Sequence, residues 1–270
     1  MAENRKPTRK FSDLVEVMTI LRKECPWDRK QTHESIKDLM VEEIYEAIEA
    51  IDNNDPDELR KELGDLLLHV VFQTEIARES GRFDIGDVIW TIQEKLIRRH
   101  PHVFEDTDAD DSEAVKRNWE DLKMKEGERK SVLQGVPGTL PALIKAYRMQ
   151  DKAAGVGFDW KSWQLAWPKL QEEIEEFRQA AEKGSEEERT EEFGDLLFSM
   201  VNVGRLMGIN AEDALRMTNR KFKYRFQHIE KVINGEGKKL RDTSLEEMDR
   251  IWDAAKGNSK SKKGSGKSQK

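Results

Sequence analysis

A ten-residue phrase occurs twice in the sequence. "ELGDLLLHVV" starts at Glu62 and "EFGDLLFSMV" starts at Glu192, with acid, glycine and acid at the same places. The segment before each phrase is repeated too, as "EEIYEAIEA" from Glu42 and "EEIEEFRQA" from Glu172, so both pairs lie 130 positions apart. Such self-similarity indicates an internal duplication. The sequence therefore predicts two similar domains in tandem.

Proline placement and apolar spacing indicate helices throughout. The chain has seven prolines, and none lies in residues 57–100 or 169–270. Apolar residues recur three and four positions apart, as in Leu14, Val17 and Met18, which is the period of an amphipathic helix. No segment alternates as a strand does. We predict an all-α fold in which each domain resembles a four-helix bundle.

Each copy of the phrase is preceded by signals that start a helix. Asp55 is the expected N-cap of the first, with Pro56 in the first helical position, where proline costs no hydrogen bond. Before the second copy, Gly184 is expected to end a helix. Ser185 and Glu188 then form a predicted capping box. Both phrases should lie on helices entered by a short turn from the preceding helix.

Composition changes along the chain predict its division into segments. Residues 127–141 are rich in Gly and Pro, as a linker is. Residues 257–270 contain mostly Gly, Ser and Lys and are expected to be disordered. The predicted segments are a polar N-terminal stretch (1–10), a first repeat (11–126), a linker (127–141), a second repeat (142–256) and a disordered tail (257–270).

Charge and cysteine content restrict the classes of function. The net charge is −7 and 37% of the residues are charged, which disfavours general binding to nucleic acid or anionic membranes. Apolar runs are far shorter than the roughly 20 residues of a membrane span. Cys25 has no partner for a disulfide within the chain, as is usual in a reducing compartment. We expect a cytoplasmic protein, with weak nucleic-acid binding by the basic tail as an alternative.

Four acidic residues recur in both halves at helical spacing. The four acids of each half form two pairs. The two members of a pair are three positions apart and so lie on one helix face. The first-half acids are Glu43, Glu46, Glu62 and Asp65, and the second-half acids are Glu173, Glu176, Glu192 and Asp195. Converging carboxylates need a cation between them, and Mg²⁺ is the natural hard ion for oxygen ligands, with Mn²⁺ as an alternative. The competing interpretation is a solvated acidic face.

A glycine within each phrase favours the metal interpretation. Gly64 and Gly194 are in mid-helix, where glycine costs about 1 kcal/mol relative to alanine. We expect both to permit close approach of another backbone. Other metal sites fit less well: no histidine follows a glutamate by three positions, as di-iron bundles require, and the single cysteine cannot build a zinc site.

Basic residues four apart are candidates for binding phosphate. The pairs are Lys221 with Arg225 and Lys95 with Arg99, and each pair presents two charges on one helix face. An ordinary basic surface turn is the alternative. Trp252 is a candidate for stacking on a nucleobase, although tryptophan in a helical domain also serves in the core.

Taken together, these residues resemble the MazG family of nucleoside triphosphate pyrophosphohydrolases, within the all-α NTP pyrophosphatase superfamily. The resemblance spans nearly the whole chain. Its phrases include "CPWDRKQTHES" from Cys25, "RRHPHVF" from Arg98 and "KAAGVGFDW" from Lys152. It implies Mg²⁺-dependent cleavage of an NTP or dNTP to the monophosphate and pyrophosphate, by water attack at the α-phosphorus. It also implies a homodimer and assigns metal binding to the eight acids given above.

The resemblance also implies roles for residues around the acids. Glu172 is the expected catalytic residue, orienting the water or taking its proton. Phosphate binding is expected from Lys169, Lys221 and Arg225, with Lys95 and Arg99 as their first-half counterparts, and base stacking from Trp252. The second half is favoured because it is denser in acids and carries Lys169. The alternative function is a non-catalytic helical module that senses nucleotides or docks a protein.

Overall fold

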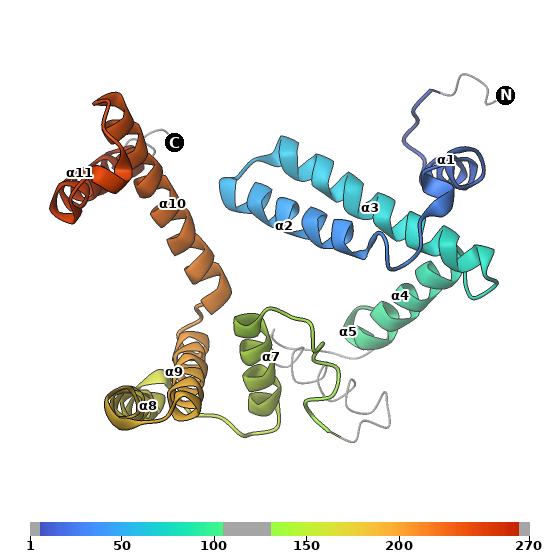
Figure 1. The fold of residues 1–270 in the computed structure, drawn as a ribbon. Helices are drawn as coiled ribbons and strands as arrows, with labels where there is room; N and C mark the ends of the chain where they lie inside the picture. Colours follow the sequence, from blue (N-terminus) through green and yellow to red (C-terminus); the bar gives the residue numbers. More distant parts are fainter. Residues whose placement is uncertain (1–5, 105–130, 265–270) are drawn as a thin grey trace. The chain divides into compact units, whose positions relative to one another are not determined.

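The computed structural model describes residues 6–104 and 131–264, the side chains of residues 257–264 excepted. Every regular element within these residues is a helix, so the predicted all-α fold is confirmed. The chain divides into two compact units, Met1–Leu122 and Lys123–Lys270. In Figure 1 the first unit runs from blue to teal and the second ends in red.

The first unit is built around a helical hairpin. Its elements are α1 (Phe11–Glu24), a 3₁₀ turn (Asp28–Lys30), α2 (Lys37–Asn53), α3 (Pro56–Glu79), α4 (Ile85–Arg99) and α5 (Pro101–Phe104). Helices α2 and α3 pack against each other as an antiparallel pair (Figure 1), and α1 packs on α3. The core between α1 and α3 contains Met18, Val71 and Phe72, together with Ile36 just before α2.

The turn between α2 and α3 is determined by local sequence. Asn54 takes the left-handed conformation, with φ 53°, which asparagine tolerates better than most residues. The Asp55 side chain accepts hydrogen bonds from the backbone N–H groups of Asp57 and Glu58, and Pro56 opens the helix. The predicted cap is confirmed. It fixes α3 beside α2 and so places the acids of the two helices opposite one another.

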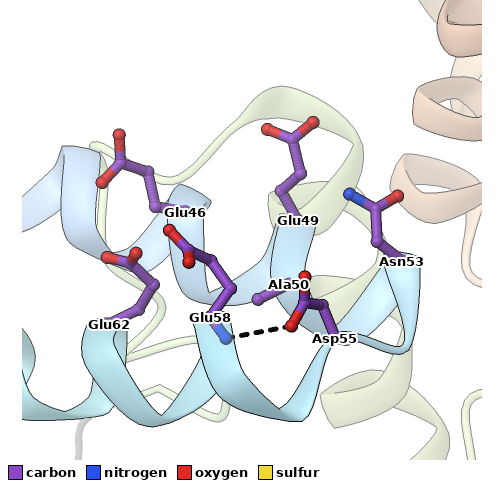
Figure 2. A pocket seen from close by; sticks show the side chains of 7 residues that line it. All are labelled: Glu46, Glu49, Ala50, Asn53, Asp55, Glu58 and Glu62. Atoms are coloured by element: carbon purple, nitrogen blue, oxygen red, sulfur yellow. Dashed lines mark hydrogen bonds between the residues drawn. The ribbon is translucent and has the colours of Figure 1, made fainter.

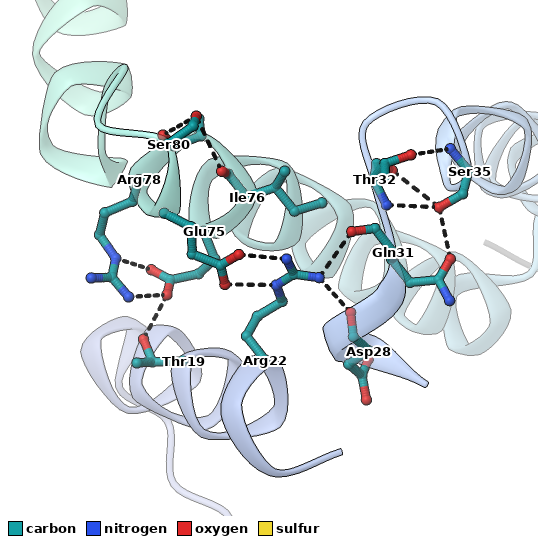
Figure 3. A network of polar contacts seen from close by, with 12 residues as sticks. Thr19, Arg22, Asp28, Gln31, Thr32, Ser35, Glu75, Ile76, Arg78 and Ser80 are labelled. Atoms are coloured by element: carbon teal, nitrogen blue, oxygen red, sulfur yellow. Dashed lines mark hydrogen bonds and ion pairs between the residues drawn. The ribbon is translucent and has the colours of Figure 1, made fainter. Parts of the chain in front are cut away.

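A buried arginine joins α1 to α3 (Figure 3). The Arg22 side chain is 6% exposed, and its Nη2 lies 2.5 Å from Oε2 of Glu79. Its Nε donates a second hydrogen bond to Oε1 of Glu79, at 2.8 Å. Its Nη1 donates to the carbonyl oxygens of Asp28 and Gln31. Arg22 therefore fixes the loop between α1 and α2 as well as the packing of α1.

The second unit repeats the hairpin with its own additions. Its elements are α7 (Ala142–Gly155), α8 (Trp163–Lys183), α9 (Glu186–Leu206), α10 (Ala211–Gly235), a 3₁₀ turn (Leu240–Asp242) and α11 (Leu245–Gly264). Helices α8 and α9 form the pair, α7 packs on α9, and α11 packs on α10 (Figure 1). Gly184 ends α8, and Ser185 and Glu188 form the predicted capping box.

Several predictions concern residues at the edges of the described ranges. An offset of 133 positions in the sequence aligns Trp119 and Lys123 with Trp252 and Lys256, and Trp119 and Lys123 lie outside the described residues. So does part of the predicted linker, whose described residues 131–141 contain turns and no helix. Helix α11 extends to Gly264 and overlaps the predicted tail. The predicted domain limits therefore stay predictions. Among the described helices, none is long and apolar enough to cross a membrane.

Candidate metal and nucleotide site

The first-half acids converge at the α2–α3 hairpin. Carboxylate oxygens of Glu43, Glu62 and Asp65 lie within 4.8 Å of one another. Glu46, the fourth predicted ligand, falls outside this group. It lines an adjacent pocket of about 270 Å³ together with Glu49, Glu58 and Glu62, shown in Figure 2. No lysine or arginine is among the lining residues of that pocket.

The environment of Glu62 favours a bound cation. Only 6% of its surface is exposed. The pKa of its carboxyl is raised to about 7, first by burial and then by the charge of Glu46 and by Glu58. Each cause disfavours a second negative charge in the group. A divalent cation held by these oxygens would remove that repulsion, so the donor set fits a hard metal ion.

The second-half acids form an equivalent group on α8 and α9. Carboxylate oxygens of Glu173, Glu176 and Glu192 lie within 4.8 Å of one another. Asp195 falls outside the group and is exposed. The pKa of Glu192 is raised by burial and then by the charges of Glu176 and Asp195. The two halves therefore share a three-carboxylate arrangement, although a different member of the quartet is left out in each.

Lys169 is bonded to the second-half acids. Its Nζ lies 2.8 Å from Oε1 of Glu172 and 2.8 Å from Oε1 of Glu173. These bonds raise the pKa of Lys169, the hydrogen bond to Glu172 being the largest cause. Lys169 lies one helical turn before Glu173, as its sequence position predicts. Glu172, the candidate catalytic residue, therefore has a cationic partner in this structure.

The basic and aromatic candidates of the second half lie together on α10 and α11. The Arg225 guanidinium carbon is 5.3 Å from the ring centroid of Trp252. The rings of Phe222 and Trp252 are 5.3 Å apart. Lys221 is one turn before Arg225 on α10 and is exposed. Within the described residues, no hydrogen bond or ion pair joins this cluster to the acids of α8 and α9.

The first-half basic pair is placed in the same way. Lys95 and Arg99 lie in the last two turns of α4. That helix contacts α3 and α5. No described hydrogen bond or ion pair links Lys95 to the acids of the α2–α3 hairpin. In each half, the structure thus brings the acids together and leaves the basic pair on a separate helix.

Comparison with known proteins places the acids and the basic pair of each half in one family domain. The family model of the MazG nucleotide pyrophosphohydrolase domain matches residues 31–104 and again residues 162–230. The chain belongs to the MazG family. Each match contains one acid group and one basic pair, and the tandem duplication is confirmed. Trp252 lies beyond the second MazG match.

Two named relatives are similar to the chain over most of their length. The chain is 47% identical to "Nucleoside triphosphate pyrophosphohydrolase/pyrophosphatase MazG" of Thermotoga maritima, over 92% of this chain and 96% of that protein. It is 42% identical to "Nucleoside triphosphate pyrophosphohydrolase" of Escherichia coli K12, over 86% and 90%. A crystal structure of a mazG-related protein from Thermotoga maritima aligns with a TM-score of 0.38 and 26% identity, covering 42% of this chain and 98% of that one.

The role expected for the two mid-helix glycines in the MazG repeats is wrong within this chain. A Cβ built on Gly64 or Gly194 would meet nothing within 4 Å. Neither glycine therefore permits close approach of a described backbone. Among the described residues, each glycine faces open space.

Two kinds of residue in the candidate sites are not predicted from the sequence. Glu49 and Glu58 line the first-half pocket, and Glu58 also lies in the first turn of α3. Phe222 contacts Trp252 and lies four positions before Phe226 on α10. Glu188 lies 130 positions after Glu58. This repeat is the sequence signal that could have pointed to Glu58.

Proposed function

We propose that this MazG protein is a Mg²⁺-dependent nucleoside triphosphate pyrophosphohydrolase. It converts an NTP or dNTP and water to the monophosphate and pyrophosphate, by water attack at the α-phosphorus. The supporting observation is the convergence of three carboxylates in each MazG repeat. Two relatives that align over most of their length carry the same activity in their names.

The grouped carboxylates are the residues that would hold the metal. In the second half they are Glu173, Glu176 and Glu192, with Asp195 on the adjoining turn of α9. Mg²⁺ would neutralise phosphate charge and lower the pKa of a bound water, and Mn²⁺ would supply the same chemistry with the same oxygen ligands. The buried Glu173 fixes one ligand against the hairpin core.

Residues of the chain supply the remaining parts of the reaction. Glu172 is exposed next to the acid group and would orient the attacking water or take its proton. Lys169, Lys221 and Arg225 would stabilise the charge on the phosphates and on the leaving pyrophosphate. Trp252, which contacts Arg225 and Phe222, would contact the base.

The second half is the proposed catalytic half. It carries Lys169 beside its acids, whereas the corresponding residue of the first half is Leu39. A lysine can bind a phosphate oxygen and a leucine cannot. The first-half acids, with Lys95 and Arg99, form the second candidate site.

We propose a homodimer as the functional state. The apolar residues Ile89, Ile92 and Leu96 recur at helical spacing along α4 and are 37%, 41% and 42% exposed. Helix α4 is described in full and none of its residues is buried. The apolar stripe of an amphipathic helix is normally buried against another element. A second copy of the chain would bury the stripe of α4. Dimerisation would also allow the basic pair of one copy to face the acids of another.

A product assay tests the proposed activity. The purified protein is incubated with a panel of NTPs and dNTPs and Mg²⁺, and pyrophosphate and monophosphate are measured. Equal amounts of the two products are expected. Release of orthophosphate alone, or metal-dependent nucleotide binding without any product, would contradict the proposal, and the second result would favour the sensing module. We propose a cytoplasmic location, where nucleoside triphosphates are available.

A further inference from the structure

Lys169 distinguishes the two acid groups from each other. Its Nζ is shared between Glu172 and Glu173, at 2.8 Å from each. The Glu173 side chain is 7% exposed and that of Lys169 is 44% exposed. An ammonium group that donates a hydrogen bond to a carboxylate offsets the negative charge beside it. One of the three grouped acids of the second half therefore already has a cation bound to it.

The first half has no cation at the corresponding place. Leu39 lies 130 positions before Lys169 and is 37% exposed. The lysine nearest in sequence to Glu62 is Lys61, whose Nζ lies 2.5 Å from Oε2 of Glu58. Glu58 is not a member of the three-acid group. Among the residues that the structure describes, no ammonium group is therefore bound to Glu43, Glu62 or Asp65.

The pockets beside the two groups differ in the same direction. Arg178 and Lys183 line the second-half pocket along with Glu176 and Glu192. The first-half pocket has no basic lining residue. Ile48 stands at the position of Arg178, and asparagine at that of Lys183. The first half is accordingly the more negative of the two, and a divalent cation should be attracted to it more strongly.

We propose that Lys169 is an internal counter-cation of the second acid group, which a divalent cation must displace from Glu173, so that the second half binds the cation more weakly than the first. This inference rests on the proposed function, because it takes both acid groups as metal sites. The displaced ammonium stays one helical turn from Glu173 and can then bind a phosphate of the nucleotide. Metal entry and phosphate binding are thereby coupled in the second half.

Mn²⁺ binding without nucleotide tests the proposal, with free Mn²⁺ measured by electron paramagnetic resonance. Glu192→Gln removes an acid of the second group, so Mn²⁺ binding then measures the affinity of the first group. Glu62→Gln removes an acid of the first group, so binding then measures the affinity of the second group. We expect tighter binding in the first case. In the Glu62→Gln background, Lys169→Leu should tighten Mn²⁺ binding about fivefold, because a salt bridge of this exposure is worth up to about 1 kcal/mol.

The reciprocal exchange provides a second, independent measurement. Leu39→Lys in the Glu192→Gln background should weaken Mn²⁺ binding about fivefold, because the new lysine would lie one turn before Glu43. Lys231→Leu is the matched control for Lys169→Leu, since it removes the same charge from α10, where Lys231 is exposed. It should change Mn²⁺ affinity by less than about twofold.

The outcomes separate this inference from the proposed function. Unchanged or weaker Mn²⁺ binding after Lys169→Leu would overturn the role of Lys169 while leaving the metal site intact. Absence of saturable Mn²⁺ binding in the unmodified chain would instead contradict the metal site itself. If thermal melting shows that Lys169→Leu does not fold, Lys169→Gln is measured in the same way, and it must tighten binding for the proposal to stand.

Discussion

At the scale of single residues, the buried acid of each group has different neighbours in the two repeats. Glu62 and Glu173 are both buried, and both belong to a three-carboxylate group. Glu62 is surrounded by other acids, and its pKa rises to about 7. Glu173 instead accepts a bond from Lys169. Two sites with one sequence pattern therefore differ in charge balance, and this difference separates their expected chemistry.

Replacing one acid in each half shows which half is catalytic. Glu192→Gln should lower pyrophosphate release by at least about 100-fold, since a metal ligand contributes several kcal/mol to charge stabilisation in the transition state. Glu62→Gln should cause a smaller loss. The measurement is pyrophosphate release at saturating NTP and Mg²⁺. Full activity of Glu192→Gln would show that the preference for the second half is wrong.

The Arg22 clamp predicts a large loss of stability from one substitution. Arg22→Met should lower the free energy of unfolding by about 2–3 kcal/mol, because it leaves the carbonyls of Asp28 and Gln31 without their donor. Arg60→Met is the control: the Arg60–Asp57 pair is 75% and 79% exposed, so less than about 0.5 kcal/mol is expected. Urea denaturation measures both. Equal effects would contradict the role of the clamp.

The same clamp predicts a pH dependence. Its arginine lowers the pKa of Glu79, chiefly by the hydrogen bond to Arg22. A lowered folded-state pKa gives stability that is present above the unfolded value of about 4.3 and is lost as pH falls through the folded value. Unfolding free energies measured from pH 6 to pH 3 should therefore fall less steeply in Arg22→Met. An unchanged slope would contradict this.

At the scale of helices, local sequence accounts for where the central hairpins begin and end. The N-caps at Asp55 and Ser185 are formed as the sequence predicts. Capping depends on residues within one turn of each other, so the neighbouring residues in the sequence suffice to predict it. The glycines of α3 and α9 are different, because their role depends on what faces them.

A substitution in mid-helix tests the open space at those glycines. Gly64→Ala should stabilise the protein by about 0.5–1 kcal/mol, since alanine favours the helix and its Cβ would meet no atom. Gly81→Ala is the control, because φ is +67° there and roughly 1 kcal/mol should be lost. Thermal melting measures both. Destabilisation by Gly64→Ala would indicate that another chain approaches this face.

At the scale of the whole molecule, the apolar stripe of α4 predicts self-association. Leu96→Asp should convert dimers to monomers of 31.4 kDa, because it places a charge in the stripe. Thr91→Asp is the control, since Thr91 lies on another face of the same helix. Light scattering coupled to size exclusion measures the mass. A monomeric unmodified chain would contradict the proposed dimer.

The sequence by itself determined the all-α class, the tandem repeat, the two caps and the acid pairs three positions apart. Each of these follows from periodicity or from contacts within a few residues of the chain. The tertiary structure alone decided that Glu46 and Asp195 fall outside their groups and that Arg22 reaches Glu79. Helix geometry fixes which face a side chain shares, whereas rotamer, register between helices and burial depend on packing between segments far apart in the chain.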